Sequence, residues 1–432
     1  MFRVFPWSGS YSSSADANTP SASGGDPKSG DSSSEKQSHQ TPTRHPPWLR
    51  SSSQPATWRN SASFNEISDG NWTYCIETQN TAPAVKGFGN VPIVSYDVIE
   101  AMGDRKLKVC TVTWNINEKG VKILSHLAQK IAERGQEMDS DIFFISLQEI
   151  PSTAPTFHEE ALRILEPVLN GHRLYLSHRA WSQMVIVFIR QKHLRYAIQP
   201  QVSFIASGAM AKPVRTKGAI AVCLRLYQRF IVLIGCHLSH ATPQQRIQDY
   251  AKVVRTLRFP QLARFHAHAK DEIFGSDVVL WIGDLNFRVT VESNVDWRDP
   301  EKITEKTFRD VFETEELASH RKKQLAFTDF KEAPIKFPPT HKFEPDTDNY
   351  VPKRIPSFTD RVLFWVRNSE WLQNIQYDCM RGTTPSDHKA VFATFWLTVI
   401  NKPVPEHYKQ QKSLEREISM KTNSVDASGP VN

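Results

Sequence analysis

Polar side chains of three kinds flank the most β-rich apolar runs of this sequence. Carboxylates, carboxamides and imidazoles stand in five short stretches: Asn115–Asn117, Gln148–Glu149, His237–His240, Asp284–Asn286 and Asp387–His388. Taken singly, each has an ordinary explanation as a turn residue, a solvated loop acid or a core histidine. Together they mark the ends of five predicted strands, and active sites in sheet proteins sit where rigid strands position such groups. We therefore expect one catalytic site at a sheet edge.

The chemistry of this group favours a magnesium-assisted reaction on a phosphate. Carboxylate and carboxamide oxygens suit Mg²⁺ better than Zn²⁺, and Mg²⁺ needs few protein ligands besides water and substrate phosphate. A carboxylate beside water can act as a general base, and a cation with an imidazolium can stabilise charge on a phosphoryl oxygen. No glycine-rich Walker loop and no cysteine-based phosphatase loop competes. The prediction is metal-assisted hydrolysis of a phosphate ester without a covalent enzyme intermediate.

The elements that must position these groups are short strands alternating with helices. Runs rich in Val, Ile and Phe predict nine strands: Leu107–Trp114, Asp141–Leu147, Met184–Ile189, Val202–Ala206, Ala219–Leu224, Phe230–Leu238, Val278–Ile282, Arg361–Val366 and Lys389–Trp396. Apolar residues at helical spacing predict a helix over Gly120–Arg134. Thr242 followed by Pro243 predicts the capped start of another helix. This pattern favours one large domain with a layered sheet.

Composition divides the 432 residues into four parts. Residues 1–70 are rich in Ser, Pro and Gly and predict a disordered arm, 71–104 a linker and approach segment, 105–400 the catalytic domain, and 401–432 a polar tail. No apolar run approaches the ~20 residues of a membrane span. The five cysteines are scattered, so we expect reduced thiols in the cytoplasm. We also expect no secretory signal and no C-terminal prenyl anchor.

The net charge of +7 is ordinary for a soluble protein but also suits an anionic partner. Nucleic acid, an inositol phosphate and an acidic membrane leaflet all satisfy that description. Charge alone does not choose among them. The role of the Ser-rich arm toward other proteins is not predicted.

Several longer motifs together resemble the inositol polyphosphate 5-phosphatases, within the Mg²⁺-dependent endonuclease/exonuclease/phosphatase superfamily. The matching stretches, in the family's order, are 114–117 (WNIN), 147–149 (LQE), 216–219 (TKGA), 237–240 (HLSH), 281–288 (WIGDLNFR), 337–343 (FPPTHKF), 354–363 (RIPSFTDRVL) and 386–389 (SDHK). The SFTDR variant is similar to the type IV, phosphoinositide-directed branch. The resemblance implies an α/β fold, a four-layered sandwich with two packed, mostly antiparallel sheets flanked by helices.

The resemblance also implies roles at the matching positions. The catalytic set implied is Asp284 to activate water, Asn286 to position it, His388 to face the scissile phosphate, Asp360 to orient His388, His237 to neutralise the leaving phosphate, and Asn115. The metal set implied is Glu149 with Asn115 beside it and Asp387 nearby. An imidazolium held by a carboxylate stays charged and aimed.

Cations outside the catalytic set would select the substrate. The positions implied by the resemblance are Lys217, Lys342, Arg354, His341 and Arg361. The loop departs from the common Thr-Tyr-Lys, because His341 replaces the tyrosine, and we expect its charge to depend on pH near neutrality. Pro352 stands where a basic residue is common, with Lys353 adjacent.

The function implied is Mg²⁺-dependent removal of the 5-phosphate of phosphatidylinositol 4,5-bisphosphate and 3,4,5-trisphosphate. The alternatives are a soluble inositol polyphosphate 5-phosphatase, a nuclease of the same superfamily, and an inactive scaffold. The expected partners are phosphoinositide headgroups on membranes, or soluble inositol phosphates, and not nucleic acid. We expect a cytoplasmic protein with peripheral membrane association.

Overall fold

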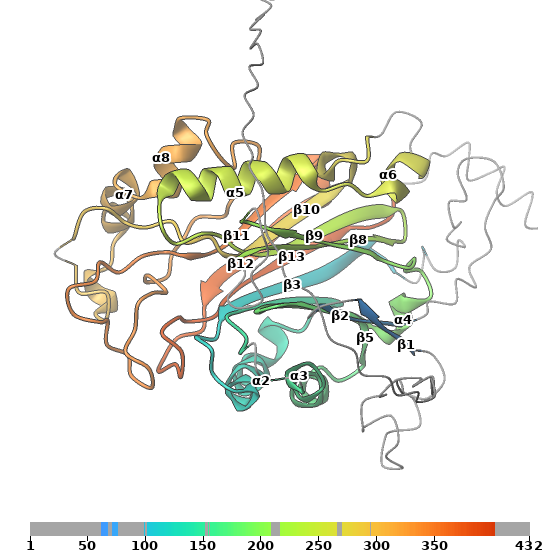
Figure 1. Cartoon of the computed structure of the whole chain (residues 1–432), viewed down its shortest axis with the longest axis horizontal. Coiled ribbons are helices and arrows are strands. Elements are labelled where there is room, and N and C mark those ends of the chain that lie inside the picture. The colour runs from blue at the N-terminus through green and yellow to red at the C-terminus, as the bar shows by residue number, and fades with distance from the viewer. Residues whose placement is uncertain are drawn as a thin grey trace, which may run out of the picture. The chain divides into compact units, whose positions relative to one another are not determined.

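The computed structural model describes residues 62–67, 71–76, 99 and 102–401, except 152–153, 155, 209–216, 266–269 and 294. Within this part of the chain the strands form two sheets (Figure 1). The larger sheet contains β1 (Ala62–Ile67), β2 (Asn71–Ile76), β5 (His172–Ala180), β6 (Gln183–Arg190), β4 (Ile142–Gln148), β3 (Lys106–Asn115), β13 (Val391–Thr398) and β12 (Leu372–Cys379), in that spatial order. The smaller sheet contains β11 (Asp360–Val366), β10 (Val278–Asp284), β9 (Arg229–His237), β8 (Gly218–Leu226) and β7 (Gln201–Ala206), also in spatial order.

Helices cover the outer face of each sheet. The helices are α2 (Leu124–Arg134), α3 (Phe157–Leu165), α4 (Gln191–Leu194), α5 (Pro243–Thr256), α6 (Pro260–Phe265), α7 (Glu305–Glu313) and α8 (Glu316–Lys322), of which α4 and α7 pack instead against the apolar cluster between the sheets. Figure 1 shows α2 and α3 on the side of the larger sheet and α5 on the side of the smaller one. No helix in the described ranges is long and apolar enough to span a bilayer.

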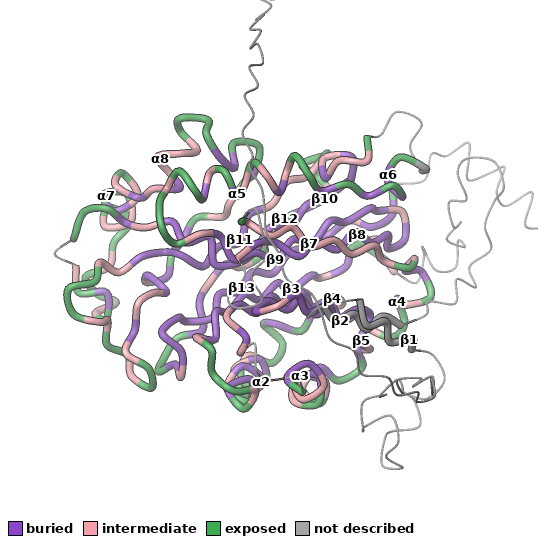
Figure 2. The backbone as a smooth tube through the Cα atoms, in the orientation of Figure 1, coloured by how far each residue is buried: buried purple, intermediate pink, exposed green. Residues whose placement is uncertain are grey.

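Three apolar layers follow from the alternation of side chains along the strands. Between the sheets, residues such as Val109 and Phe144 pack with Leu280 of the opposite sheet. The strand residues of the larger sheet that point away from the smaller sheet pack under α2 and α3. Those of the smaller sheet that point away from the larger one pack under α5. Figure 2 shows the buried backbone running through both sheets. The predicted four-layered sandwich is therefore confirmed.

Strand pairing confirms the mostly antiparallel character. All neighbouring strands run antiparallel except one pair in each sheet, β3 with β4 and β9 with β10. The registers place Asn115 opposite Gln148 and Asp284 opposite His237. The two parallel pairs thus end in the polar stretches singled out in the sequence.

The sheets approach closely near these ends. An added Cβ at Gly235 of β9 would lie 2.5 Å from the Ser146 Oγ of β4 and 2.7 Å from the Val185 Cγ1 of β6. Such distances are far inside van der Waals contact, so glycine permits this approach of the two sheets.

All nine predicted strands are present, with ends that differ by a few residues. The predicted helix over Gly120–Arg134 begins with a short 3₁₀ turn and continues as α2. Helix α5 begins at Pro243, and the Thr242 hydroxyl accepts a hydrogen bond from the Gln245 amide at 3.2 Å. The capped start predicted there is confirmed.

Four strands were missed: β1, β2, β5 and β12. Strand β12 alternates exposed and buried residues at the edge of the larger sheet, and β5 contains several polar residues, so neither has the apolar run that predicts a strand. Strands β1 and β2 fall inside the expected arm (1–70) and linker (71–104). They extend the sheet by backbone pairing, β1 with β2 and β2 with β5, which composition does not reveal. The tail expected at 401–432 lies outside the described residues after 401, as does the arm before residue 62.

Candidate active site

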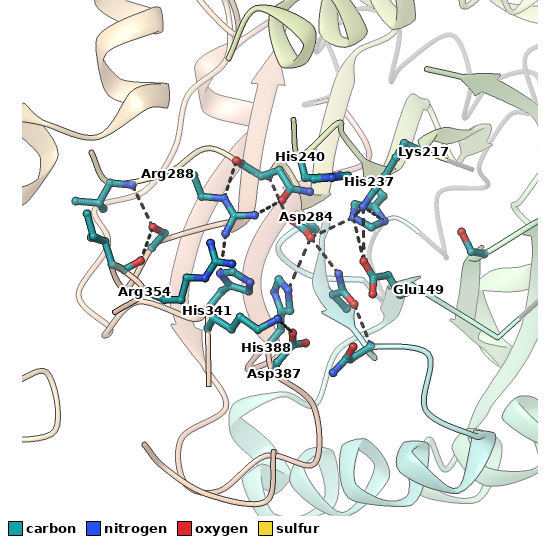
Figure 3. Close-up of a pocket in the computed structure, with 18 of the residues that line it drawn as sticks. Glu149, Lys217, His237, His240, Asp284, Arg288, His341, Arg354, Asp387 and His388 are labelled. Carbon is teal, nitrogen blue, oxygen red and sulfur yellow. Dashed lines mark hydrogen bonds and ion pairs between the residues drawn. The ribbon is translucent and has the colours of Figure 1, made fainter. Parts of the chain in front are cut away.

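A cavity of about 780 Å³ lies where the ends of the two parallel strand pairs meet. It is lined by Asn115, Asn117, Glu149, Ser182, Lys217, His237, His240, Asp284, Asn286, Arg288, Val289, His341, Lys342, Lys353, Arg354, Ile355, Ser357, Asp387 and His388. Figure 3 shows Asp284 and His388 in the middle, with Glu149 and Lys217 toward one end and Arg354 toward the other. The cavity therefore places acids and imidazoles between Lys217 at one end and several cations at the other.

The same type of backbone turn follows β10, which ends at Asp284, and β3, which ends at Asn115. Asp284 Oδ1 accepts a hydrogen bond from the Asn286 amide at 3.0 Å, and Asn115 Oδ1 accepts one from the Asn117 amide at 3.0 Å. Asn286 and Asn117 have φ values of 58° and 51°, a left-handed conformation that asparagine tolerates. Before Asp284, an added Cβ at Gly283 would lie 2.0 Å from the Cys236 carbonyl oxygen. The local sequence therefore fixes the backbone positions from which the Asp284 and Asn115 side chains project.

Asp284 lies close to three other buried polar side chains of the cavity. Its Oδ2 accepts a hydrogen bond from Asn115 Nδ2 at 3.1 Å and lies 3.3 Å from His237 Nε2 and 3.9 Å from His388 Nε2. Burial raises the pKa of this carboxyl, but the hydrogen bond from His237 and the charges of His388 and Lys217 outweigh it and hold the pKa well below its ordinary value. Asp284 is therefore a carboxylate at neutral pH.

His388 is held from behind by Asp360. Its Nδ1 donates to Asp360 Oδ2 at 2.9 Å, and the same oxygen accepts hydrogen bonds from the Thr340 and Thr359 hydroxyls. Burial lowers the pKa of His388, but the neighbouring carboxylates of Asp360, Asp284 and Asp387 outweigh this and raise it to about 9. His388 is therefore an imidazolium at neutral pH, with Nε2 on the side of Asp284.

His237 behaves differently although it also lies beside Asp284. Lys217 Nζ contacts its ring, and Glu149 Oε1 lies 3.7 Å from His237 Nε2 and 3.6 Å from Lys217 Nζ. Burial and the charge of Lys217 lower the pKa of His237. The carboxylates of Asp284 and Glu149 oppose this shift. The role expected of His237, to help neutralise the leaving phosphate, stays a prediction.

The opposite end of the cavity is basic and comes from three loops. Lys342 Nζ forms an ion pair with Asp387 Oδ2 at 2.8 Å, and Lys353 and Arg354 are exposed. Arg288 Nη1 donates to His341 Nδ1 at 2.7 Å. Burial, together with His388 and Arg288, holds the pKa of His341 well below its ordinary value. The expectation that its charge varies near neutral pH is therefore wrong, because the ring stays neutral.

Comparison with known proteins agrees with this arrangement. Residues 112–394 match the family described as Endonuclease/Exonuclease/phosphatase family 2. The chain belongs to this family. It is 30% identical over 321 residues to the phosphatidylinositol 4,5-bisphosphate 5-phosphatase INP51 of Saccharomyces cerevisiae, covering 68% of this chain and 31% of that protein. It is 25% identical over 312 residues to the type IV phosphatidylinositol polyphosphate 5-phosphatase of Mus musculus, covering 68% of this chain and 46% of that protein.

The chain thus spans less than half the length of these two curated relatives, which include the expected type IV branch. Among solved structures, the inositol polyphosphate 5-phosphatase domain of SPsynaptojanin, in complex with inositol (1,4)-bisphosphate and a calcium ion, superposes with a TM-score of 0.56. That match is 23% identical and covers 75% of this chain and 93% of that one. At this identity the likeness concerns the fold.

Of the residues predicted from sequence, all but two line the cavity. Asp360 lies one layer behind it, against His388. Arg361 is not in the site, which corrects the prediction that it binds substrate. Its guanidinium is buried and pairs with Glu332 at 2.6 Å and Glu315 at 3.1 Å. Successive residues of a strand face opposite sides, so a side chain next to Asp360 in β11 must point away from the cavity.

Sequence reasoning missed several lining residues, among them Arg288. It ends the 281–288 stretch already quoted, so its presence near the site could have been inferred. Its contact with His341, 53 positions later, could not.

The oxygen donors at the Glu149 end fit a divalent ion such as Mg²⁺. The Glu149 carboxylate and the Asn115 carboxamide come from adjacent strand ends, and the Glu149 side chain is 32% exposed, which leaves room for water ligands. Two groups of side chains centred on His388, with Asp284 and Asp360 or with His341 and Asp387, also bring possible ligand atoms within 4.8 Å. Asp387, expected near the metal, forms an ion pair with Lys342.

Proposed function

We propose that this chain is a metal-dependent 5-phosphatase of phosphoinositides, acting on phosphatidylinositol 4,5-bisphosphate and 3,4,5-trisphosphate. The observation that carries the proposal is the pairing of a carboxylate, Asp284, with an imidazolium, His388, 3.9 Å apart in a cavity with a basic end. The carboxylate suits a nucleophilic water, the imidazolium suits a phosphate oxygen, and the basic end suits further phosphates. The names of the relatives support the same reaction.

Each residue then has a role that its surroundings permit. His388 donates from Nε2 to an oxygen of the 5-phosphate, and Asp360 keeps this imidazole charged and aimed. Asp284 and Asn286 orient the attacking water. The low pKa of Asp284 makes it a weak base, which suits a loose phosphoryl-transfer transition state that relies on positioning and charge more than on proton removal. A bound Mg²⁺ would neutralise charge on the transferred group, and Glu149 and Asn115 would hold it.

Lys342, Lys353 and Arg354 would bind phosphates that are not cleaved. Lys342 is 40% exposed and reaches Asp387 now, so a phosphate must compete with this ion pair. Arg354 offers a bidentate contact and the lysines offer point charges. Since a lipid headgroup and a free inositol phosphate share this chemistry, we infer action at a membrane surface from the names of the relatives and not from the cavity.

The test is a substrate panel. The purified chain is incubated with short-chain phosphoinositides, with the matching soluble inositol phosphates, and with single- and double-stranded DNA, each with and without Mg²⁺. We expect Mg²⁺-dependent release of phosphate from 5-phosphorylated substrates and intact DNA, and an Asp284→Asn control that releases none. Cleavage of DNA would favour the nuclease, and no reaction with any substrate would favour the inactive scaffold.

A further inference from the structure

Arg288 connects two parts of the cavity that are far apart in sequence. Its Nε donates to the Asn286 carbonyl oxygen at 3.2 Å, its Nη2 donates to Asn286 Oδ1, and its Nη1 donates to His341 Nδ1 at 2.7 Å. Among the described residues, no carboxylate lies within 4.0 Å of its guanidinium, although the guanidinium lies in a half-buried wall. The donors of Arg288 are therefore directed at cavity residues and not at a balancing acid.

This contact fixes the hydrogen-bonding state of His341. A guanidinium can only donate, so His341 Nδ1 must accept, and in a neutral imidazole the proton then lies on Nε2. The surrounding backbone holds the ring in place, since the His341 and Ser357 amides and carbonyls bond each other at 3.3 and 2.7 Å. The ring centroid lies 4.3 Å from that of His388. His341 thus offers its neighbours one N–H donor and no free acceptor.

We propose that Arg288 is a positioning residue that holds His341 as an Nε2–H donor for a phosphate oxygen in the cavity and joins it to Asn286. The identity of the phosphate ligand rests on the proposed function, whereas the state of the ring does not. Without Arg288, His341 can adopt the other tautomer and turn a lone pair toward the anion, which repels it. Because Arg288 also contacts Asn286, it holds both the loop that carries His341 and the turn that carries Asn286.

The first experiment determines directly which nitrogen of the His341 ring carries the proton. The full chain is labelled with ¹⁵N-histidine, kept in EDTA, and studied by NMR as the wild type and as Arg288→Met and Arg288→Lys, with His341→Gln to assign the signal. The control is Arg298→Met, which removes an exposed arginine paired with Asp296, away from His341. We expect a single Nε2–H tautomer in the wild type, the control and the lysine variant, and a mixture in Arg288→Met. An unchanged ring in Arg288→Met overturns the proposal.

The second experiment measures affinity for soluble inositol 1,4,5-trisphosphate by calorimetry in EDTA, across Arg288→Met, His341→Phe and the double variant. Loss of a charge-assisted hydrogen bond predicts about tenfold weaker binding for each single variant. The double variant should be no weaker than His341→Phe, because Arg288 acts through the ring. Independent, multiplying losses contradict the proposal, as does a lysine variant as weak as the methionine one. Thermal unfolding of each variant identifies any that fails to fold.

The two proposals fail in different ways. If the wild type releases no phosphate but Arg288→Met changes the ring and weakens binding, the enzymatic proposal fails and the positioning role stands. If the wild type is active and the His341 ring is unaffected by Arg288→Met, the positioning role fails and the enzymatic proposal stands.

Discussion

Replacing Asp360 by asparagine removes one charge and keeps the shape of the side chain. The Thr340 and Thr359 hydroxyls that donate to Asp360 Oδ2 can still donate to the amide oxygen. His388 Nδ1, which donates to that carboxylate at 2.9 Å, instead meets a neutral amide. The variant therefore isolates the electrostatic contribution of Asp360 to the charge of His388.

The size of the effect follows from the pKa of His388, which rises from 6.5 to about 9. At about 1.4 kcal/mol per pKa unit, this corresponds to about 3 kcal/mol in favour of the charged ring. Because the folded-state pKa is raised, this stabilisation is present below pH 6.5 and is lost as the pH rises through 9. In Asp360→Asn the pKa should fall toward 6.5, because Asp360 makes the largest contribution that raises it and burial opposes the charge. At pH 8 the charged fraction would drop from about nine tenths to a few hundredths.

Two measurements check this. NMR titration of His388 in EDTA should show a midpoint near 9 in the wild type and at least two pH units lower in Asp360→Asn, with Asp296→Asn, an exposed acid, as the unchanged control. The alkaline limb of phosphate release should move down by the same interval. A variant in which His388 still titrates near 9 would show that Asp284 and Asp387 hold the charge, and would refute the assignment to Asp360.

Further predictions concern other parts of the site and its support. Asp284→Ala should abolish turnover while circular dichroism stays native, and normal phosphate release would refute its role beside the attacking water. Lys342→Ala should raise KM more for substrates with a 4-phosphate than for those without, and equal effects would remove the loop from specificity. Arg361→Met removes the buried guanidinium that pairs with Glu315 and Glu332, so urea unfolding should show a loss of about 3–5 kcal/mol. A stable variant with a raised KM would instead restore Arg361 to the site.

The strands that were predicted from the sequence share a physical property. Strands buried on both faces are rich in consecutive apolar residues, and β4 and β6 were found for that reason. Strand β12 exposes alternate residues at a sheet edge, and β2 is held by backbone pairing to β5. Neither feature leaves an apolar run, so local patterns could not identify them.

Part of the site was predicted because its residues stand at strand ends, and Lys217, Lys342 and Arg354 were predicted from the family resemblance. The errors came from properties that depend on three dimensions. Arg361 shares a motif with Asp360 but faces the opposite side of β11. The neutral state of His341 depends on burial and on Arg288, which no spacing reveals.

The close approach of the two sheets at Gly235 has a consequence for rate as well as for stability. Asn115 belongs to one sheet and its partner Asp284 to the other, so their 3.1 Å contact is also a measure of how far apart the sheets stand. Gly235 lies two residues before His237, and Ser146 lies two residues before Gln148. A methyl group at Gly235 would wedge the layers apart just beneath the reacting groups, so Gly235→Ala should slow turnover even at temperatures where the protein stays folded.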